Sequence, residues 1–177
     1  LGKKRILISS IEHSAVMGSC EFMKKQGYEI VKIPVDKVGL VDLLFLEKEL
    51  KKSKNILVVS VMHVNNVLGT IEPIAEIGKL CKKYGVLFHT DAAQSFAKLK
   101  IDVRAMNVDL LSASAHKING PKGIGLLYVL DGVKIAPIIF GGGQERGLRG
   151  GTENVAGIVG FAHALESFDS RAFDKIK

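Results

Sequence analysis

Chemically capable side chains follow several apolar runs of this sequence, each at the point where a run ends. The run DLLSASA leads directly into His116 and Lys117, and the run VLFHT leads into Asp91 and Gln94. In open α/β sheets, ligands bind beyond the carboxyl ends of the strands. If these runs are strands of one sheet, an amine, a carboxylate, an imidazole and an amide gather at its edge.

Two further apolar runs end in the same way. RILISS is followed by His13, and NILVVSVM is followed by His63, Asn65 and Asn66. Taken singly, each residue has an ordinary interpretation. Asparagines form turns, and a lone Asp91 is as consistent with a helix cap as with a functional residue. For His63 we keep the interpretation of a hydrogen-bonded structural residue. The set as a whole indicates a functional site.

The combination of groups predicts chemistry on a carbonyl cofactor. A partly desolvated lysine loses its proton more easily and becomes a nucleophile toward carbonyls. A carboxylate can hold a proton on a pyridine nitrogen, and hydroxyl groups with a glycine-rich loop can bind a phosphate. Pyridoxal phosphate needs this set of groups. We therefore predict that Lys117 carries the cofactor as a Schiff base.

Apolar runs alternate with segments of helical period along the whole chain. Strands are expected over 5–10, 28–35, 55–64, 86–90, 109–115 and 123–130. Helices are expected over 14–26 and 41–52, from Pro73 to Gly85, and after Thr152, which we predict as a cap near the start of the last helix. The alternation is typical of an α/β fold with a mostly parallel sheet. The short connection before 123–130 favours an antiparallel last strand.

Composition narrows the class of protein. The 177 residues, 47% of them hydrophobic, suffice for one domain with a core. No apolar stretch approaches the roughly 20 residues of a membrane-spanning helix, so no membrane association is expected. Cys20 and Cys81 fall within expected helices, and we interpret them as buried thiols of a cytoplasmic protein and not as a metal pair. No metal site is expected.

The formal net charge of +7 raises the alternative of a basic nucleic-acid-binding module. The lysines, however, are spread in pairs along the expected helices, and only 6% of the residues are aromatic. Such charges are typical of solvated helix faces. We therefore expect no nucleic-acid partner.

The motifs that hold these residues resemble those of the cysteine desulfurases. These are class V aminotransferase-like, fold-type-I pyridoxal-phosphate enzymes, and the nearest branch serves iron–sulphur cluster assembly and nitrogen fixation. The resemblance runs over essentially the whole chain and is carried by SASAHKINGPKGIG, HTDAAQS, VMHVNN followed by LGTIEPI, EHSAV, and GGGQERGLRGGTENV. It implies a three-layer α/β/α fold in which residues 1–177 form the cofactor-binding large domain. An N-terminal segment and a small C-terminal domain are expected to lie outside these residues.

The resemblance assigns roles around the cofactor ring. It implies that Lys117 binds the cofactor and later moves protons at the substrate α-carbon. Asp91 would pair with the ring nitrogen, and Gln94 would approach the phenolic oxygen. His13 would stack on the ring, and Asn66, in preference to Asn65, would lie near the ring and the substrate.

The resemblance also assigns the phosphate contacts. Ser114 and His116 would hold the phosphate, and Thr152 would reach the phosphate of a partner subunit, which implies a homodimer. The reaction implied is the conversion of L-cysteine to L-alanine, with the sulphur passed to an enzyme cysteine and then to an iron–sulphur scaffold or another acceptor protein. Neither Cys20 nor Cys81 matches that cysteine, so the chain alone is not expected to turn over. A selenocysteine lyase and another class V aminotransferase remain alternatives.

Overall fold

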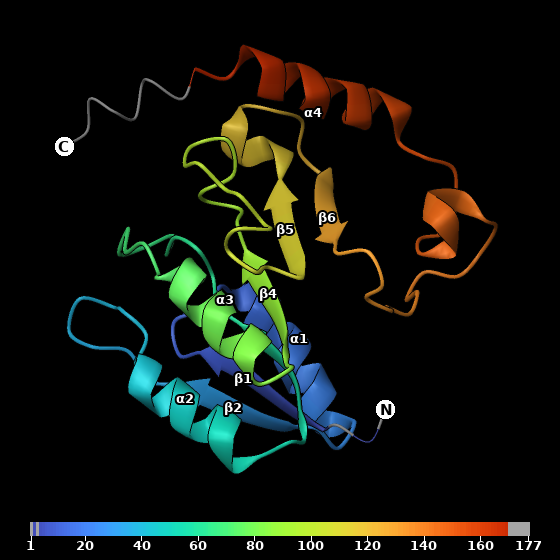
Figure 1. Cartoon of the computed structure of the whole chain (residues 1–177). Coiled ribbons are helices and arrows are strands. Elements are labelled where there is room, and N and C mark those ends of the chain that lie inside the picture. The colour runs from blue at the N-terminus through green and yellow to red at the C-terminus, as the bar shows by residue number, and fades with distance from the viewer. Residues whose placement is uncertain (1, 3, 170–177) are drawn as a thin grey trace.

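The computed structural model describes residue 2 and residues 4–169, which form one six-stranded sheet flanked by helices (Figure 1). The strands are β1 (Arg5–Ser9), β2 (Glu29–Ile33), β3 (Ile56–Ser60), β4 (Leu87–Asp91), β5 (Leu110–Ser114) and β6 (Gly125–Val129). Their order across the sheet is β2-β1-β3-β4-β5-β6. The first five strands pair in parallel, and β6 pairs antiparallel to β5. The predicted mostly parallel sheet and the predicted direction of the last strand are both confirmed.

Helices cover both faces of the sheet. The elements are α1 (Ser14–Lys25), α2 (Leu43–Lys52), α3 (Ile74–Lys83) and α4 (Val155–Ser167), with two short 3-10 turns, η1 (Ala115–Ile118) and η2 (Gln144–Gly147). Leu7 and Phe88 belong to the core cluster that contains the buried residues of α2 and α3, whereas Ile6 and Ile8 pack with α1. Because neighbouring residues of a strand point to opposite faces, α1 lies on the face opposite α2 and α3. Figure 1 shows this arrangement, and the three-layer prediction is confirmed.

The strand predicted over 55–64 is regular only to Ser60. Beyond Ser60 the chain still runs beside β4, because the Val61 N–H donates to the His89 carbonyl at 3.1 Å and the His63 N–H donates to the Asp91 carbonyl at 2.9 Å. The chain then turns at Asn65. The loop that follows β3 is thus held against the end of β4.

Helix α4 packs against the turn that follows β5. Its buried Phe161 lies with Ala115 and Ile118 of η1, and its ring meets Phe96 edge-on with centroids 5.9 Å apart. In Figure 1 the helix lies across the end of β5. None of the helices in the described part of the chain is both long and apolar enough to cross a membrane.

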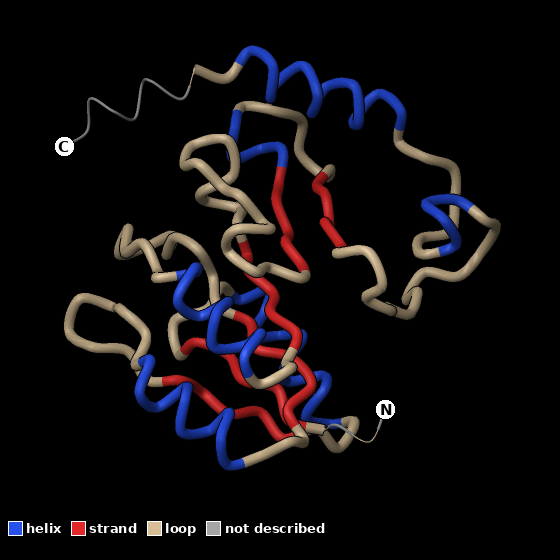
Figure 2. The backbone as a smooth tube through the Cα atoms, viewed as in Figure 1, coloured by secondary structure: helices blue, strands red, loops and turns tan. Residues whose placement is uncertain are grey.

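The predicted cap of α4 is wrong by two positions. Asn154 is the N-cap, and its side-chain oxygen accepts the Gly157 N–H at 3.1 Å. A cap must precede the first helical residue directly so that its side chain reaches the N–H groups of the first turn. Thr152 lies too early, in the long segment between β6 and α4 that Figure 2 draws mostly as loop.

Candidate active site

The carboxyl ends of four parallel strands meet along one edge of the sheet. Asp91 is the last residue of β4 and Ser114 is the last residue of β5. Asp91 is in register with Ser112, so Ser114 lies one pleat further along the same edge. The η1 turn starts directly after Ser114 and contains His116 and Lys117. The fold therefore brings the predicted amine, carboxylate, hydroxyl and imidazole to neighbouring strand ends.

The turn that contains Lys117 is closely packed. Ala115 and Ile118 are buried, Lys117 is half-buried between them, and Asn119 ends the turn in the left-handed conformation with φ of 64°. A Cβ atom on Gly120 would lie 2.9 Å from both the Cβ and the carbonyl oxygen of Ala115. The glycine after the turn is thus required for the chain to fold back, and the backbone beneath Lys117 is fixed.

A second lysine lies near Lys117. Partial burial lowers the pKa of Lys98, and the positive charge of Lys117 lowers it further. The unprotonated amine is the form that attacks a carbonyl. The amine of Lys98 is therefore partly desolvated and lies close enough to Lys117 for their charges to interact.

Asp91 keeps one carboxylate oxygen available. Its Oδ1 accepts the Ala93 N–H at 2.9 Å, an Asx turn in place of a helix cap. None of the described residues donates a hydrogen bond to Oδ2. Gln94 follows in the same half-buried turn, which lies under the Phe96–Phe161 contact. A cationic N–H group could therefore pair with Asp91 without displacing a protein partner.

His13 caps helix α1, a role that the sequence analysis did not predict. Its Nδ1 accepts the Ala15 N–H at 3.2 Å. In the neutral ring the proton therefore sits on Nε2. The side chain is exposed at the carboxyl end of β1, where the predicted site lies.

The two asparagines after β3 differ in environment. Asn65 is buried, and its Oδ1 accepts the N–H groups of Val67 and Leu68 at 2.9 and 2.8 Å. Its Nδ2 donates to the Ile11 carbonyl at 2.9 Å, which joins this loop to the loop of His13. Asn66 is exposed. Asn65 is therefore structural, and Asn66 is the one left accessible.

The last two polar residues singled out in the sequence are His63, which is buried, and Thr152, which lies apart from this edge. Burial lowers the pKa of His63. The prediction that its side chain is hydrogen-bonded is wrong for Nδ1, which has no partner among the described residues. Thr152 is exposed in the segment between η2 and α4, which extends away from the sheet in Figure 1. The structure does not bring Thr152 to the other candidates within one chain.

Sequence analysis missed two polar features behind the edge. His89 bridges three strands, with Nδ1 2.8 Å from Ser60 Oγ and Nε2 3.3 Å from Ser112 Oγ. Burial lowers the pKa of His89, and its position two residues before Asp91 places it on the same face of the sheet. The second feature is the buried side chain of Glu12, beside His13. The sequence signal for His89 was a histidine within an apolar strand, two residues before Asp91, whereas Glu12 gave no comparable signal.

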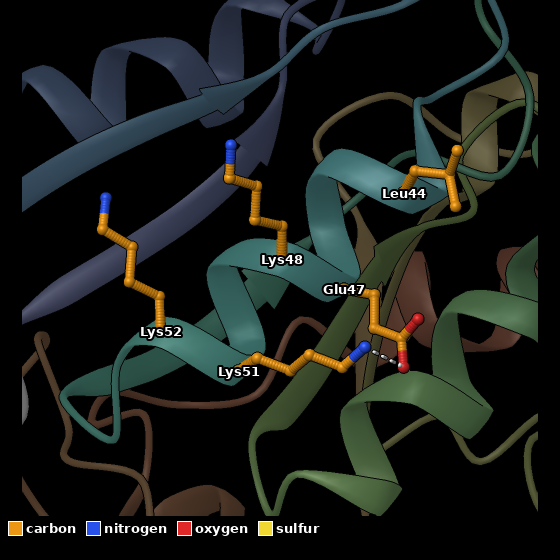
Figure 3. Close-up of a pocket in the computed structure, with 5 residues that line it drawn as sticks. All are labelled: Leu44, Glu47, Lys48, Lys51 and Lys52. Carbon is orange, nitrogen blue, oxygen red and sulfur yellow. Dashed lines mark ion pairs between the residues drawn. The ribbon is translucent and has the colours of Figure 1, made fainter.

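A separate hollow of about 420 Å³ lies on helix α2, away from the strand ends (Figure 3). Its lining residues are Leu44, Glu47, Lys48, Lys51 and Lys52. Figure 3 shows the Lys51 side chain directed to Glu47, with 3.4 Å between Nζ and Oε1. This hollow contains none of the candidate residues.

The comparisons with known proteins identify the family. The sequence matches the profile of the family Aminotransferase class-V over residues 1–177. The chain belongs to the class-V aminotransferases. It is 50% identical over 163 residues to the cysteine desulfurase IscS of Dictyoglomus turgidum, which covers 92% of this chain and 41% of that protein. It is 47% identical over 182 aligned positions to the mitochondrial cysteine desulfurase of Candida albicans, covering 98% of this chain and 37% of that protein.

Solved structures of similar proteins superpose closely on this class-V aminotransferase chain. The structure named "SspA in complex with cysteine" superposes with a TM-score of 0.90 at 43% identity, over 98% of this chain and 52% of that one. A NifS-like protein superposes with a TM-score of 0.88 at 43% identity, over 93% of this chain and 45% of that one. The chain thus spans about half or less of the length of the relatives it matches.

The class-V aminotransferases are pyridoxal-phosphate enzymes. The groups at the sheet edge fit that cofactor in their chemistry: a half-buried amine at Lys117, a carboxylate oxygen of Asp91 that accepts no hydrogen bond from the described residues, and an exposed imidazole at His13. Ser114 and His116 both precede Lys117 and offer a hydroxyl and an imidazole for a phosphate. The donor set therefore matches an aldehyde, a ring nitrogen, a ring face and a phosphate.

Proposed function

We propose that residues 1–177 are the cofactor-binding domain of a cysteine desulfurase, which converts L-cysteine to L-alanine and passes on the sulphur. The observation that carries the proposal is the placement of Asp91 and Lys117 at the ends of neighbouring parallel strands. The similarity to cysteine desulfurases along 92% of the chain supports the choice of substrate. The relative named as a complex with cysteine supports it further.

The candidate residues would divide the work of binding and proton transfer. Pyridoxal phosphate, when bound, supplies an aldehyde that bonds to amines and a ring that withdraws electrons from the substrate α-carbon. Lys117 Nζ would hold the cofactor through its aldehyde and would take the proton from the substrate α-carbon. Asp91 keeps a proton on the ring nitrogen. His13 packs on the ring, while Gln94 donates to the phenolic oxygen.

Other residues would fix the cofactor and the substrate. Ser114 Oγ and His116 donate hydrogen bonds to the phosphate, and Thr152 does so from the partner subunit. Asn66, whose side chain is exposed, would orient the substrate. The need for Thr152 from a second chain is the reason for proposing a homodimer.

The thiol that accepts the sulphur would lie outside residues 1–177. Burial raises the pKa of Cys81 to about 12 and also raises the pKa of Cys20, so neither supplies a thiolate at neutral pH. In the proposed step a thiolate of the enzyme attacks the substrate sulphur, the S–S bond forms and the C–S bond breaks. The electron pair of the broken bond stays on the substrate carbon, which takes a proton to give alanine.

The persulphide would pass to an iron–sulphur scaffold or another acceptor protein. The names of the relatives as cysteine desulfurases support a sulphur acceptor of this kind. Cys20 and Cys81 are buried and unpaired, which suits the reducing cytoplasm that we propose as the setting.

The experiment uses the full-length protein loaded with pyridoxal phosphate. With dithiothreitol present to reduce the persulphide, it measures alanine and sulphide released from L-cysteine, with L-selenocysteine as the competing substrate and Lys117→Ala as the control. We expect equimolar alanine from cysteine and a loss of at least about 10³-fold in the variant, as for removal of a nucleophile. Release from selenocysteine alone would contradict the proposal and favour a selenocysteine lyase.

A further inference from the structure

Glu12 is a buried carboxylic acid at the junction of three elements of the site. Its side chain follows β1, and only 7% of its surface is exposed. Its Oε1 accepts a hydrogen bond from Ser9 Oγ, at the end of β1, at 2.6 Å. The same atom accepts the Met62 N–H, just beyond β3, at 2.8 Å. One oxygen thus ties the end of β1 to the chain that leaves β3.

The two segments joined by Glu12 contain candidate site residues. His13 is the next residue after Glu12, and Asn66 follows Met62 in the loop after β3. The Met62 loop is in turn fixed to β4, because the His63 N–H donates to the carbonyl of Asp91. The Glu12 contacts and the bond from Asn65 to the Ile11 carbonyl therefore hold the two loops to each other beside Asp91.

The second oxygen of Glu12 has no hydrogen-bond partner among the described residues, although it is buried. The ionisable groups that act on it come from each neighbouring element: Cys20 on α1, Glu72 before α3, and Asp91 on β4. Burial raises the pKa of Glu12 to about 7 against the bonds from Ser9 and Met62, and the charges of Asp91 and Glu72 add to the rise. The charge of Glu12 therefore changes near neutral pH.

We infer that Glu12 is a positioning residue of the site, which clamps the loops of His13 and Asn66 together and whose charge is coupled to the charge balance at Asp91. The inference rests on the proposed function, because it supposes that a cationic ring nitrogen pairs with Asp91. Coupling of this kind is reciprocal. If the charge of Asp91 disfavours ionised Glu12, a cation on Asp91 favours it, and ionised Glu12 strengthens the binding of that cation.

The sign of the pH effect follows. Below pH 7 Glu12 is neutral and resembles glutamine, which keeps the Oε1 acceptor and the shape. Above pH 7 the wild-type chain gains a negative charge that Glu12→Gln lacks. The ratio of the dissociation constants of the variant and the wild type should rise from near one at pH 6 to about fivefold at pH 8.5. Other groups that titrate in this range affect both proteins and cancel in the ratio.

The test titrates pyridoxal phosphate into the full chain by absorbance at several pH values. Glu72→Gln is the matched control, because Glu72 is also buried, accepts one backbone N–H from Val41 and has a second oxygen without a partner among the described residues. The Glu72 side chain bonds to Val41 and to neither site loop, and its charge raises the pKa of Glu12. Glu72→Gln should therefore keep the gain in cofactor affinity with rising pH and move it to lower pH. Ser9→Ala provides a second variant if Glu12→Gln does not fold. Loss of the hydrogen bond from Ser9 destabilises ionised Glu12. The gain in cofactor affinity with rising pH should therefore occur at higher pH in Ser9→Ala.

Two results would overturn the inference. A Glu12→Gln ratio that is the same at every pH would show a structural role alone, and an unmoved midpoint in Ser9→Ala would contradict the coupling. Wild-type chain that binds no pyridoxal phosphate at any pH would contradict the proposed function as well. If the wild-type chain binds pyridoxal phosphate but the ratio of the dissociation constants of Glu12→Gln and the wild type does not change with pH, the inference alone is contradicted.

Discussion

At the residue scale, His13 combines a cap with a proposed ring contact, and two substitutions separate these roles. Asparagine also caps helices, so His13→Asn should keep the free energy of unfolding within about 0.5 kcal/mol, whereas His13→Ala should lose about 1 kcal/mol. Both variants lose the imidazole ring that would stack on the cofactor, which should weaken pyridoxal-phosphate binding by about threefold to tenfold. Denaturant unfolding and cofactor titration measure the two effects. A His13→Asn chain that binds like the wild type would contradict the stacking role.

The thiol of Cys81 should be inert in the folded chain. Because burial raises its pKa to about 12, about one molecule in 10⁴ carries the thiolate at pH 8. In a Cys20→Ser variant, which leaves Cys81 alone, a disulfide reagent should label the chain only after denaturation. Rapid stoichiometric labelling of the native variant would contradict this. The raised pKa also means that folding stability should fall as pH rises above the ordinary thiol value of about 8.5.

Individual residues differ in how far the sequence revealed them. Asp91 and Lys117 could be read from the sequence because each ends an apolar run, and strand direction fixes where run ends lie. The resemblance favoured Asn66 over Asn65, but the burial of Asn65, which depends on its bond to the loop of Ile11, could not be predicted from the sequence. Glu12 gave no signal of its own, since its partners Ser9 and Met62 come together only in the folded chain.

At the element scale, two helical glycines offer a matched pair. An added Cβ on Gly18 of α1 meets no atom within 4 Å, whereas one on Gly78 of α3 would lie 1.9 Å from the Met106 carbonyl oxygen. Gly18→Ala should therefore stabilise the chain by about 0.5–1 kcal/mol. Gly78→Ala should destabilise it by about 1–3 kcal/mol or more, because the helix must move off the 102–108 segment. Denaturant unfolding compares them, and equal effects would contradict the described packing.

The elements were largely predictable because their apolar periods are clear. Helix α1 and strand β1 begin where the pattern predicts, at Ser14 and Arg5. The errors occur where side-chain bonds decide the boundary. Asn154, and not Thr152, caps α4, since its oxygen reaches the Gly157 N–H. The pattern of apolar residues is the same for either choice.

At the scale of the whole molecule, the charge of +7 should not make the chain a nucleic-acid binder. Lysines on α2 and α3 contact acids, as for Lys83 with Glu47 at 3.0 Å and Lys52 with Glu49 at 3.5 Å. Figure 3 shows the adjoining Lys51 directed to Glu47 as well. Duplex DNA should therefore bind no tighter than about 100 μM at physiological salt. Fluorescence anisotropy measures this, and micromolar binding with a steep salt dependence would support the alternative.

The central claim is that the amine of Lys117 binds the cofactor beside Asp91. The most direct measurement is to load the full chain with pyridoxal phosphate, reduce it with borohydride, digest it and locate the pyridoxyl group by mass spectrometry. Lys98 is the internal control, because its partly buried amine lies in the same region. We predict the label on Lys117, with none on Lys98, and no label in a Lys117→Ala variant. A label on Lys98 or on any other lysine, or none in the wild-type chain, would contradict the account.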